Sequence, residues 1–297
     1  MKIVNKCDFF VPFGTIFCKI SIKNTAKAVS LQPINKKSTS MKVTVIGAGN
    51  MGGAIARGLA KGTIVGEADI TVADPSEQTL QKLQQEHTLI TVSHDNRSAI
   101  AEADIVIVAV KPWLMKTVLA ELPLQPQQVL VSVAAGICFE QLVEYTALPS
   151  LTMFRIVPNT AMSQLQSMTL IAEYQATSEH KRLLLEIFNE MGMAMLIPES
   201  QIAATTALTS CGIAYVLKYI QAAMQAGVEM GIYPKDAQRM VAQSVMGAAS
   251  LILNNDTHPA IEIDKVTTPG GITIKGINEL EHNGFTSAVI RAIKASR

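Results

Sequence analysis

Two glycine-rich turns, far apart in this 297-residue chain, present backbone N–H groups that could hold an anion. The first is a G-x-G-x-x-G pattern that follows an apolar run and opens a helical pattern. There Gly47 permits a tight turn, Gly49 lets the backbone approach a diphosphate, and Gly52 lets the helix lie close to the strand. A tight turn without a ligand is the alternative. We predict that a dinucleotide binds the whole turn: Gly47, Ala48, Gly49, Asn50, Met51 and Gly52.

An acidic residue, Asp74, follows the next apolar run, 22 residues after Gly52. At that position its carboxylate can accept a hydrogen bond from a ribose hydroxyl, which favours NAD over NADP. The next few residues include no Arg or Lys that could hold a 2′-phosphate, although Ser76 could contact one. The alternative is that Asp74 only starts the following helix, because Asp-Pro-Ser is a good start signal.

Two further segments end predicted strands at the same edge of the sheet. Ligands of open parallel sheets bind beyond the carboxyl ends of the strands, and small residues there let a nicotinamide ring approach the backbone. For Lys111 a solvated loop cation is an equal alternative. The residues predicted to line this part of the site are Ala109, Val110, Lys111, Pro112, Ala134, Ala135 and Gly136.

The second turn is the Pro-Gly-Gly sequence at residues 269–271, which a helical pattern follows at once. The glycine N–H groups lack side-chain cover, and hydroxyl groups of Thr267, Thr268 and Thr273 flank them. Exposed N–H groups at the start of a helix suit a carboxylate. From these residues alone, an ordinary capped helix start is an equal alternative.

Hydrophobic periodicity predicts the elements that position these turns. In the first two thirds of the chain, short apolar runs alternate with helical patterns such as Asn50–Lys61 and Ser76–Gln85, which indicates βαβ crossovers and a parallel sheet. The expected strands are Val43–Ile46, Ile70–Ala73, Leu89–Val92, Asp104–Val110, Val129–Ala134 and Leu151–Val157, with two more near Met168–Ala172 and Met193–Ile197.

From Gln201 onward no strand-like alternation persists. Thr205–Gly231 reads as one long helix in which only Lys218 and Glu229 are charged. It is long enough to cross a membrane, but its polar residues and central Lys218 favour burial against other helices, and we expect it to pack on a second subunit. Further helices are expected at Asp236–Leu253, Thr273–Glu281 and Thr286–Ser296.

These patterns predict an α/β fold class, with an N-terminal Rossmann-type parallel-sheet domain at residues 41–200 and an all-α dimerisation and substrate domain at residues 201–297. Hydrophobic residues make up 48% and charged residues 16% of the chain, which suggests surface buried between subunits. The net charge of +1 offers no basic field for nucleic acid. Four cysteines and five histidines without metal spacing indicate no metal site and reduced thiols, as in the cytoplasm.

Residues 1–40 contain seven lysines and one acidic residue, Asp8. As a targeting signal the segment is poor, because Pro12, Gly14 and Lys19 interrupt its apolar run and it contains none of the Arg that transit peptides favour. We expect a disordered extension, or an upstream start codon with Met41 as the true beginning.

The sequence TTPGGITIKGINELEHNGF, residues 267–285, resembles the signature of the pyrroline-5-carboxylate reductase family, which makes proline. The resemblance runs from Met41 to about Ile293. It includes the GAGNMG turn, AVKP at 109–112, SVAAG at 132–136, R-x-x-P-N-T at 155–160 and GAAS…HPA at 247–260.

The resemblance implies that NADPH or NADH occupies the first turn, with Asn96 at the adenosine end and the AVKP and AAG segments at the nicotinamide. It implies that the Pro-Gly-Gly loop holds the carboxylate of 1-pyrroline-5-carboxylate. Hydride would pass from the nicotinamide to the C=N carbon, and Thr273 would face the ring nitrogen as the catalytic residue. The implied partner is a second copy in a homodimer that shares each active site, possibly within a decamer. The implied substrate-binding residues are Thr268, Gly270, Gly271 and Thr273.

Three positions depart from the family pattern. Ala161 replaces the proline of N-T-P, Ile213 replaces the helix-starting proline of S-G-S-G-P-A-Y, and Ile272 stands where Thr or Ala is usual. Substrate affinity and loop order are the properties that these changes would affect.

Two other functions fit the same turns. One is another imine or keto-acid reductase of the β-hydroxyacid dehydrogenase type, in which a lysine on the first helix of the second domain acts as general acid. Lys218 is the only candidate there and has no matching motif around it. The other is a catalytically silent NAD(P)-binding protein, for which Ala161 and Ile213 would be signs of decay.

Overall fold

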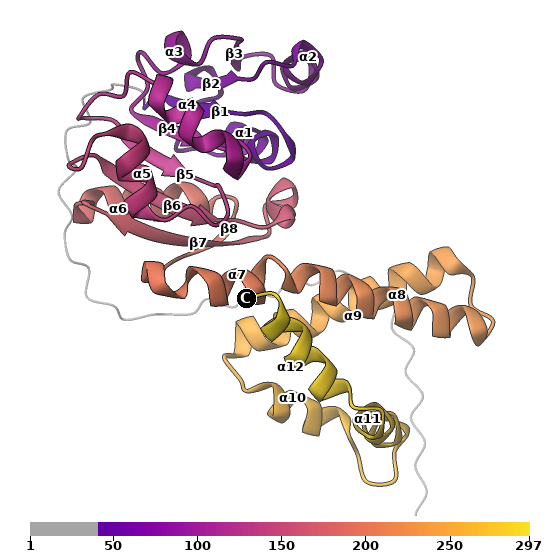
Figure 1. The fold of residues 1–297 in the computed structure, drawn as a ribbon. Helices are drawn as coiled ribbons and strands as arrows, with labels where there is room; N and C mark the ends of the chain where they lie inside the picture. Colours follow the sequence, from indigo (N-terminus) through magenta and orange to yellow (C-terminus); the bar gives the residue numbers. More distant parts are fainter. Residues whose placement is uncertain (1–40) are drawn as a thin grey trace, which may run out of the picture. The chain divides into compact units, whose positions relative to one another are not determined.

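The computed structural model describes residues 41–297, so the expectations for residues 1–40 lie outside the described part of the chain. An eight-stranded sheet has the strand order β3-β2-β1-β4-β5-β6-β7-β8 (Figure 1). Its strands are β1 (Val43–Ile46), β2 (Ile70–Ala73), β3 (Thr91–Ser93), β4 (Ile105–Val108), β5 (Val129–Ser132), β6 (Thr152–Val157), β7 (Ser167–Tyr174) and β8 (Gly192–Leu196).

The predicted parallel sheet is correct for β1 to β6, but β7 pairs antiparallel to β6. Only residues 158–166 connect these two strands, and a parallel crossover needs a dozen residues or more. Strand β4 stops at Val108, two residues earlier than expected, which leaves Ala109 and Val110 in the loop. Strand β3 begins at Thr91 because the chain is still in a turn at Leu89–Ile90.

Helices connect most of the strands, and the predicted helix 50–61 forms with the predicted limits. The predicted 76–85 helix starts one residue later because the Ser76 hydroxyl caps it by accepting from the N–H of Thr79. The α-helices of this part are α1 (Asn50–Lys61), α2 (Glu77–Glu86), α3 (Asn96–Ala99), α4 (Met115–Glu121), α5 (Phe139–Thr146) and α6 (Ser178–Asn189).

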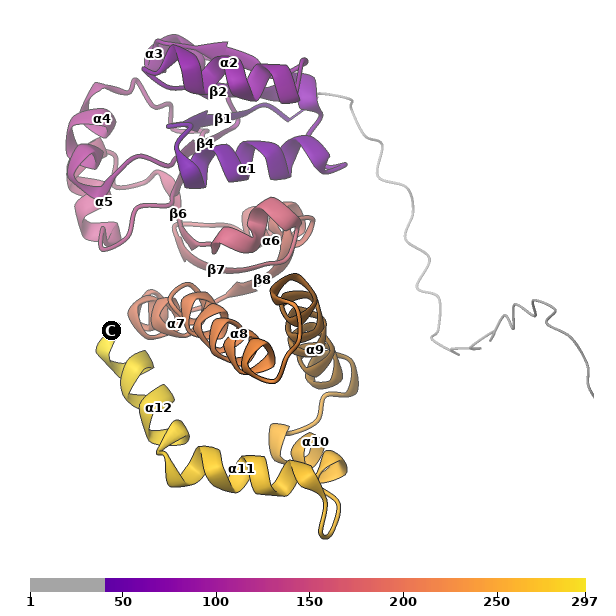
Figure 2. The same ribbon diagram turned by 90° about the vertical axis from the view of Figure 1, so that its right-hand side faces the viewer.

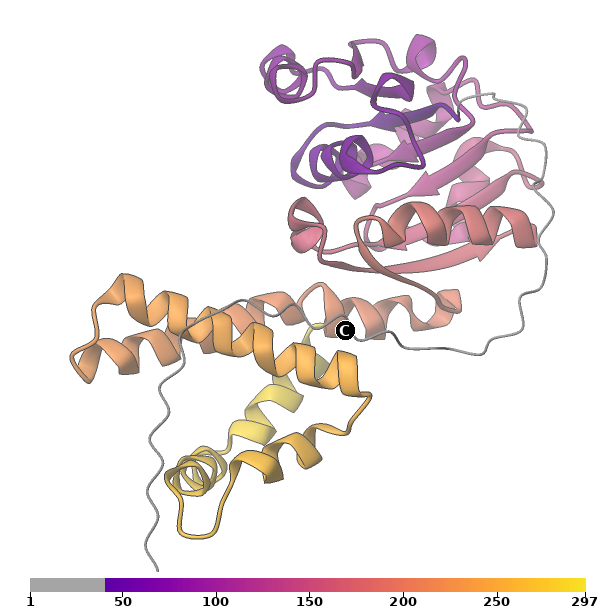
Figure 3. The same ribbon diagram turned by 180° about the vertical axis from the view of Figure 1, so that it is seen from behind.

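Two apolar clusters cover the two faces of the sheet. Helices α1, α2 and α6 pack on one face through residues such as Ile55, Leu83 and Phe188 (Figure 3). Helices α4 and α5 pack on the other face through residues such as Leu119 and Leu142 (Figure 1). Because both faces are covered, the central strands β1, β4 and β5 are buried along their whole length and are mostly apolar.

The chain after β8 is helical, as predicted. Its helices are α7 (Ile202–Thr209), α8 (Gly212–Glu229), α9 (Pro234–Asn255), α10 (Pro259–Val266), α11 (Ile272–His282) and α12 (Phe285–Ala295). Helices α8 and α9 pack against each other as a hairpin (Figure 2). The predicted single helix 205–231 is wrong, because it breaks between Thr209 and Gly212. There Ser210 and Cys211 both donate their N–H to the carbonyl of Thr206, and the Ser210 hydroxyl donates to the carbonyl of Pro158.

By length and composition alone, Glu199–Glu229 could cross a membrane: an 18-residue window in it has a mean hydropathy of 1.2, and 11% of that window is buried within one chain. Across α8 to α12 the described chain buries only Gly227 and Ala237. Large apolar side chains such as Leu217, Met246 and Leu253 are exposed there. An apolar surface of this extent marks an interaction face.

Candidate functional site

The glycine turn between β1 and α1 is built as a cradle. Gly47 has a φ of +94°, which favours glycine, and its N–H donates to the carbonyl of Ala73 at 2.7 Å. A Cβ on Gly52 would lie 1.8 Å from the carbonyl oxygen of Gly47, so only glycine fits there. A Cβ on Gly49 would meet nothing within 4 Å. The turn is thus tightly packed at Gly47 and Gly52, whereas Gly49 borders open space. Helix α1 begins there without a side-chain cap.

A crevice of about 720 Å³ opens beyond the carboxyl ends of β1, β2 and β4. This is where open parallel sheets bind their ligands. Most of the predicted cofactor residues lie in its wall, which supports the strand-end argument. The predicted residues that line it are Gly47, Gly49, Asn50, Met51, Asp74, Asn96, Ala109, Val110, Lys111, Pro112 and Ala135.

The other predicted cofactor residues do not line this crevice. Ala48 and Ser76 contact Asp74 through their backbone N–H groups, and Gly52 packs against Gly47. Ala134 is buried, and the neighbouring Gly136 turns the chain with a φ of +77°. The sequence prediction missed Pro75, His94, Leu114 and Val118, which also line the crevice.

Asp74 joins the turn to the second strand. Its Oδ2 accepts the N–H of Ala48 at 2.7 Å, and its Oδ1 accepts the N–H of Ser76 at 2.8 Å. The alternative that Asp74 merely caps α2 is wrong, because the side-chain cap of that helix is Ser76. Two backbone N–H groups therefore hold the Asp74 carboxylate beside the glycine turn, and Asp74 lines the crevice.

His94 bridges two segments at the same end of the crevice. Its Nδ1 lies 3.1 Å from the carbonyl oxygen of Asp74, and its Nε2 lies 2.6 Å from Oε2 of Glu77. The hydrogen bond with His94, followed by one from Gln81, holds the pKa of Glu77 below its usual value. His94 directly follows β3, so the strand-end rule that selected Asp74 could also have found it.

Asn96 and Lys111 lie at the starts of short helices that face the crevice. Asn96 begins α3, which Asp95 caps by accepting N–H groups from Arg97 at 3.0 Å and Ser98 at 3.2 Å. The bond from Arg97 is the main reason that the pKa of Asp95 is lowered. Lys111 is exposed and precedes a short 3-10 helix at Pro112–Leu114.

The Pro-Gly-Gly loop connects α10 to α11 as a tight turn. The N–H of Gly271 donates to the carbonyl of Thr268 at 2.9 Å, and Gly270 has a φ of +71°. Proline second and a positive-φ glycine third are the features of a type II turn. Gly271 then starts α11 without a side-chain cap, which leaves N–H groups for a ligand.

The structure does not bring this loop into the crevice of the same chain. The described residues that line the crevice all come from residues 46–135. Thr268, Gly270 and Thr273 are exposed, and Gly271 is half-buried. A site that uses both turns would need the loop of another copy.

The departures from the family pattern are absorbed locally. Ala161 has an N–H that proline lacks, and it donates to Oδ1 of Asn159 at 3.1 Å. Helix α8 still begins at Gly212 although Ile213 replaces the proline. Ile272 is 86% exposed, so its larger side chain meets no obstacle within the chain.

Lys218, the candidate general acid of the alternative reductase, is exposed and donates from Nζ to Oε1 of Gln221 at 2.9 Å. It is not among the described residues that line the crevice. The geometry therefore gives no support to a lysine-based mechanism.

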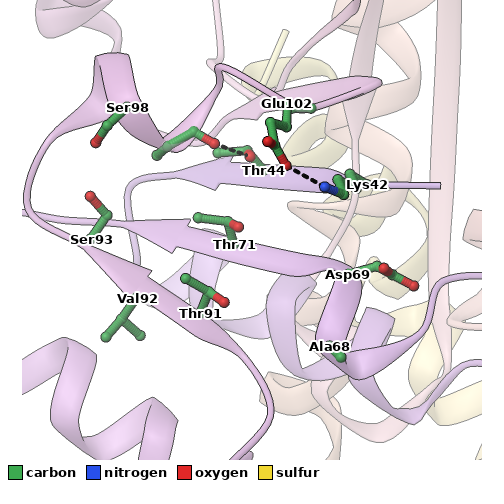
Figure 4. Close-up of a pocket in the computed structure, with 12 residues that line it drawn as sticks. Lys42, Thr44, Ala68, Asp69, Thr71, Thr91, Val92, Ser93, Ser98 and Glu102 are labelled. Atoms are coloured by element: carbon green, nitrogen blue, oxygen red, sulfur yellow. Dashed lines mark hydrogen bonds and ion pairs between the residues drawn. The ribbon is translucent and has the colours of Figure 1, made fainter. Parts of the chain in front are cut away.

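A second hollow of about 380 Å³ lies against β1, β2 and β3 (Figure 4). Hydroxyl side chains such as Thr44 and Thr71 line it, and a Lys42–Glu102 ion pair lies at its edge. The buried Thr44 hydroxyl already donates to the carbonyl of Ala99. None of the site residues predicted from the sequence lines this hollow, so it is a weaker candidate than the crevice.

Two family descriptions match the chain, "Pyrroline-5-carboxylate reductase dimerisation" at residues 199–297 and "NADP oxidoreductase coenzyme F420-dependent" at residues 42–136. Pyrroline-5-carboxylate reductase of Methanosarcina acetivorans is 37% identical over 87% of this chain and 97% of its own length. Pyrroline-5-carboxylate reductase 1 of Dictyostelium discoideum is also 37% identical, over 86% of this chain. This chain spans about half of that relative, 48% of its length.

Solved structures agree with the sequences. The crystal structure of Plasmodium falciparum pyrroline carboxylate reductase with NADP bound has a TM-score of 0.78 and 27% identity, and covers 86% of this chain and 95% of its own. The fold class predicted from the sequence is confirmed, and the chain belongs to the pyrroline-5-carboxylate reductase family.

Proposed function

We propose that this protein reduces 1-pyrroline-5-carboxylate to L-proline with NADH or NADPH, the final step of proline biosynthesis. The observation that carries the proposal is the pair of turns. One has a glycine cradle at the carboxyl ends of the strands, and the other has uncapped N–H groups next to Thr273. Membership of the reductase family supports the assignment of one turn to the cofactor and the other to the substrate carboxylate.

The residues of the crevice fit a nicotinamide dinucleotide. Gly49 leaves open space where a side chain would intrude, and the free N–H groups of α1 suit a diphosphate. Asp74 can accept from a ribose hydroxyl, and Asn96 lines the same end. Small residues, Ala109 and Ala135, leave room for a flat ring at the other end. When bound, the nicotinamide supplies a hydride.

The Pro-Gly-Gly loop would hold the substrate carboxylate. The N–H group of Gly270, the free N–H groups at the start of α11 and the Thr268 hydroxyl provide the donors. Thr273, in the first turn of α11, would donate its hydroxyl to the ring nitrogen or relay a proton to it. Residues 268–273 contain no acid or histidine, so rate enhancement would come mainly from holding the two rings together.

The working form would be a homodimer formed by the helical part, possibly within a decamer. The exposed apolar surface of α8 to α12 and the dimerisation family match support this assembly. In it, the loop of one copy would serve the crevice of another. The family and the reduced cysteines favour the cytoplasm as its compartment, without a membrane or nucleic-acid partner.

A steady-state assay of oxidation of each cofactor, with and without 1-pyrroline-5-carboxylate, tests the proposal. We expect oxidation only with substrate and formation of one L-proline per cofactor. A fluorescence titration that shows cofactor binding without turnover would instead support the silent binding protein. Turnover of keto acids or other imines, but not of this substrate, would support the other reductase.

A further inference from the structure

The R-x-x-P-N-T segment at residues 155–160 is a motif that the proposed function leaves without a role. It runs through the end of β6, which is parallel to β5, so its last residues lie at the same edge of the sheet as the crevice. No residue of the segment lines that crevice. Its last residues instead contact the end of α7, where the helical part begins.

Two hydrogen bonds join the end of this segment to the end of α7. The Ser210 hydroxyl donates to the carbonyl of Pro158 at 3.0 Å, and Nδ2 of Asn159 donates to the carbonyl of Thr209 at 3.4 Å. Asn159 is only 6% exposed, and its Oδ1 accepts the N–H of Ala161 at 3.1 Å. Each segment therefore donates one bond to the other. This set of four residues is here termed the α7 joint: Pro158, Asn159, Thr209 and Ser210.

The α7 joint lies at the interruption between α7 and α8. Cys211 donates its N–H to the carbonyl of Thr206 at 3.1 Å, five residues earlier, whereas an α-helix joins residues four apart. A wider turn of this kind is a point at which a helix bends. Helix α8 begins directly after it, at Gly212. The direction of α8 therefore depends on these few residues, and the joint ties them to the end of β6.

The helix that starts at the glycine turn holds the other side of the segment. A short 3-10 helix, η3 (Thr160–Gln164), follows the segment and packs on α1. Its Met162 is fully buried, in the apolar cluster that includes Ile55 and Leu59 of α1. A continuous set of contacts thus runs from α1, through η3 and the α7 joint, to the start of α8.

We propose that Asn159 and Ser210 are positioning residues for the proposed reaction, because they fix the direction in which α8 leaves the sheet. The inference rests on the proposed function, in which the Pro-Gly-Gly loop of one copy serves the crevice of another. Helix α8 begins the apolar face through which the copies would associate, so its direction decides where the loop of the other copy arrives. A misplacement of about 1 Å between reacting groups can cost about a hundredfold in rate.

Substitutions in the full chain, followed by steady-state kinetics, test the positioning role. Ser210→Ala and Asn159→Ala should each lower kcat/KM for 1-pyrroline-5-carboxylate about fivefold or more, while cofactor affinity and the oligomeric state stay unchanged. Ser210→Thr keeps the hydroxyl and should restore most of the loss. Ser244→Ala is the matched control, because that hydroxyl donates to the carbonyl of Met240 within α9, at 2.9 Å. Fluorescence titration and sedimentation check the cofactor affinity and the assembly.

Hydrogen exchange measures the α7 joint without catalysis. We expect the amides of residues 206–214 to exchange about fivefold faster or more in Ser210→Ala, with exchange in β1, β4 and β5 unchanged. Unchanged exchange at residues 206–214 would overturn the proposal, as would equal losses of turnover and cofactor affinity, which mark a purely structural role.

The kinetic outcomes separate this inference from the proposed function. If the unsubstituted protein does not reduce 1-pyrroline-5-carboxylate, the proposed function fails and the positioning role fails with it. If the unsubstituted protein is active and Ser210→Ala is equally active, or Ser210→Thr is as impaired as Ser210→Ala, the positioning role alone is overturned.

Discussion

The sheet and the helices after it differ in how much of their apolar surface one chain can bury. Two clusters cover both faces of the sheet, and its central strands are fully buried. In α8 to α12, by contrast, described side chains such as Leu217, Met246 and Leu253 face outward. The first part is complete within one chain, and the second needs a partner to cover it.

The largest effect is expected from charged substitutions on the exposed apolar face of α8 to α12. We expect Leu217→Glu combined with Met246→Glu to give monomers and a loss of activity of at least about tenfold, because a buried charge disfavours assembly. Sedimentation and the steady-state assay check both. Leu89→Glu is the control, since Leu89 is an equally exposed leucine, 61%, beside the complete sheet. A dimeric, active double variant would contradict the interface.

Two glycines of the turn after β1 test how tightly the part of the chain that forms the sheet is packed. Gly52→Ala should destabilise the fold by about 2 kcal/mol or more and abolish cofactor binding, because its Cβ would meet a backbone oxygen at 1.8 Å. Gly49→Ala should have the melting temperature of the unsubstituted protein, and its cofactor affinity alone should fall. Thermal melting and fluorescence titration separate the two, and equal melting of both variants would show that the cradle is not tight.

Thr273→Ala tests whether a side chain of the helical part, the Thr273 hydroxyl, takes part in the reaction. We expect turnover to fall about tenfold through loss of one hydrogen bond, with cofactor affinity unchanged. Thr267→Ala is the matched control, because that hydroxyl donates to the carbonyl of Ile263 within α10. Unchanged turnover in Thr273→Ala would remove that residue from the mechanism.

An ion pair joins the two parts at Arg155 and Glu199, with Nη1 2.6 Å from Oε1. Arg155 is buried, and Glu199 also accepts the N–H of Phe139. Glu199→Gln should lower the free energy of unfolding by about 2 kcal/mol, less than a fully buried pair would lose, because a third of the Glu199 side chain is exposed. Chemical denaturation measures the loss, and a change below about 0.5 kcal/mol would mean that the pair is not structural.

The smallest effect is expected at the exposed Lys42–Glu102 pair. Its hydrogen bond lowers the pKa of Glu102 and raises that of Lys42. The lowered pKa means that the Glu102 contribution is present above the unfolded-state pKa and disappears as the pH falls through the folded-state pKa. Because solvent screens the pair, Glu102→Gln should shift the thermal midpoint at pH 7 by only about 1 °C. A shift of several degrees would show that the pair matters more than its exposure suggests.

Sequence patterns predicted the centre of the sheet well because β1, β4 and β5 are buried along their whole length and read as short, mostly apolar runs. They missed the antiparallel direction of β7, which depends on the short connection from β6. They also missed the helix break before Gly212, because the residues on both sides of it are apolar and the hydrophobic pattern does not change there. In the crevice they found backbone features such as Gly47. They missed His94, although it follows β3 directly and the strand-end rule that selected Asp74 would have placed it at the same edge.

The uncovered face of α8 to α12 has a thermodynamic consequence. If folding of this part is coupled to association, its stability obeys mass action, and the melting temperature must rise with protein concentration. Dilution alone would then unfold the helical part while leaving the sheet intact.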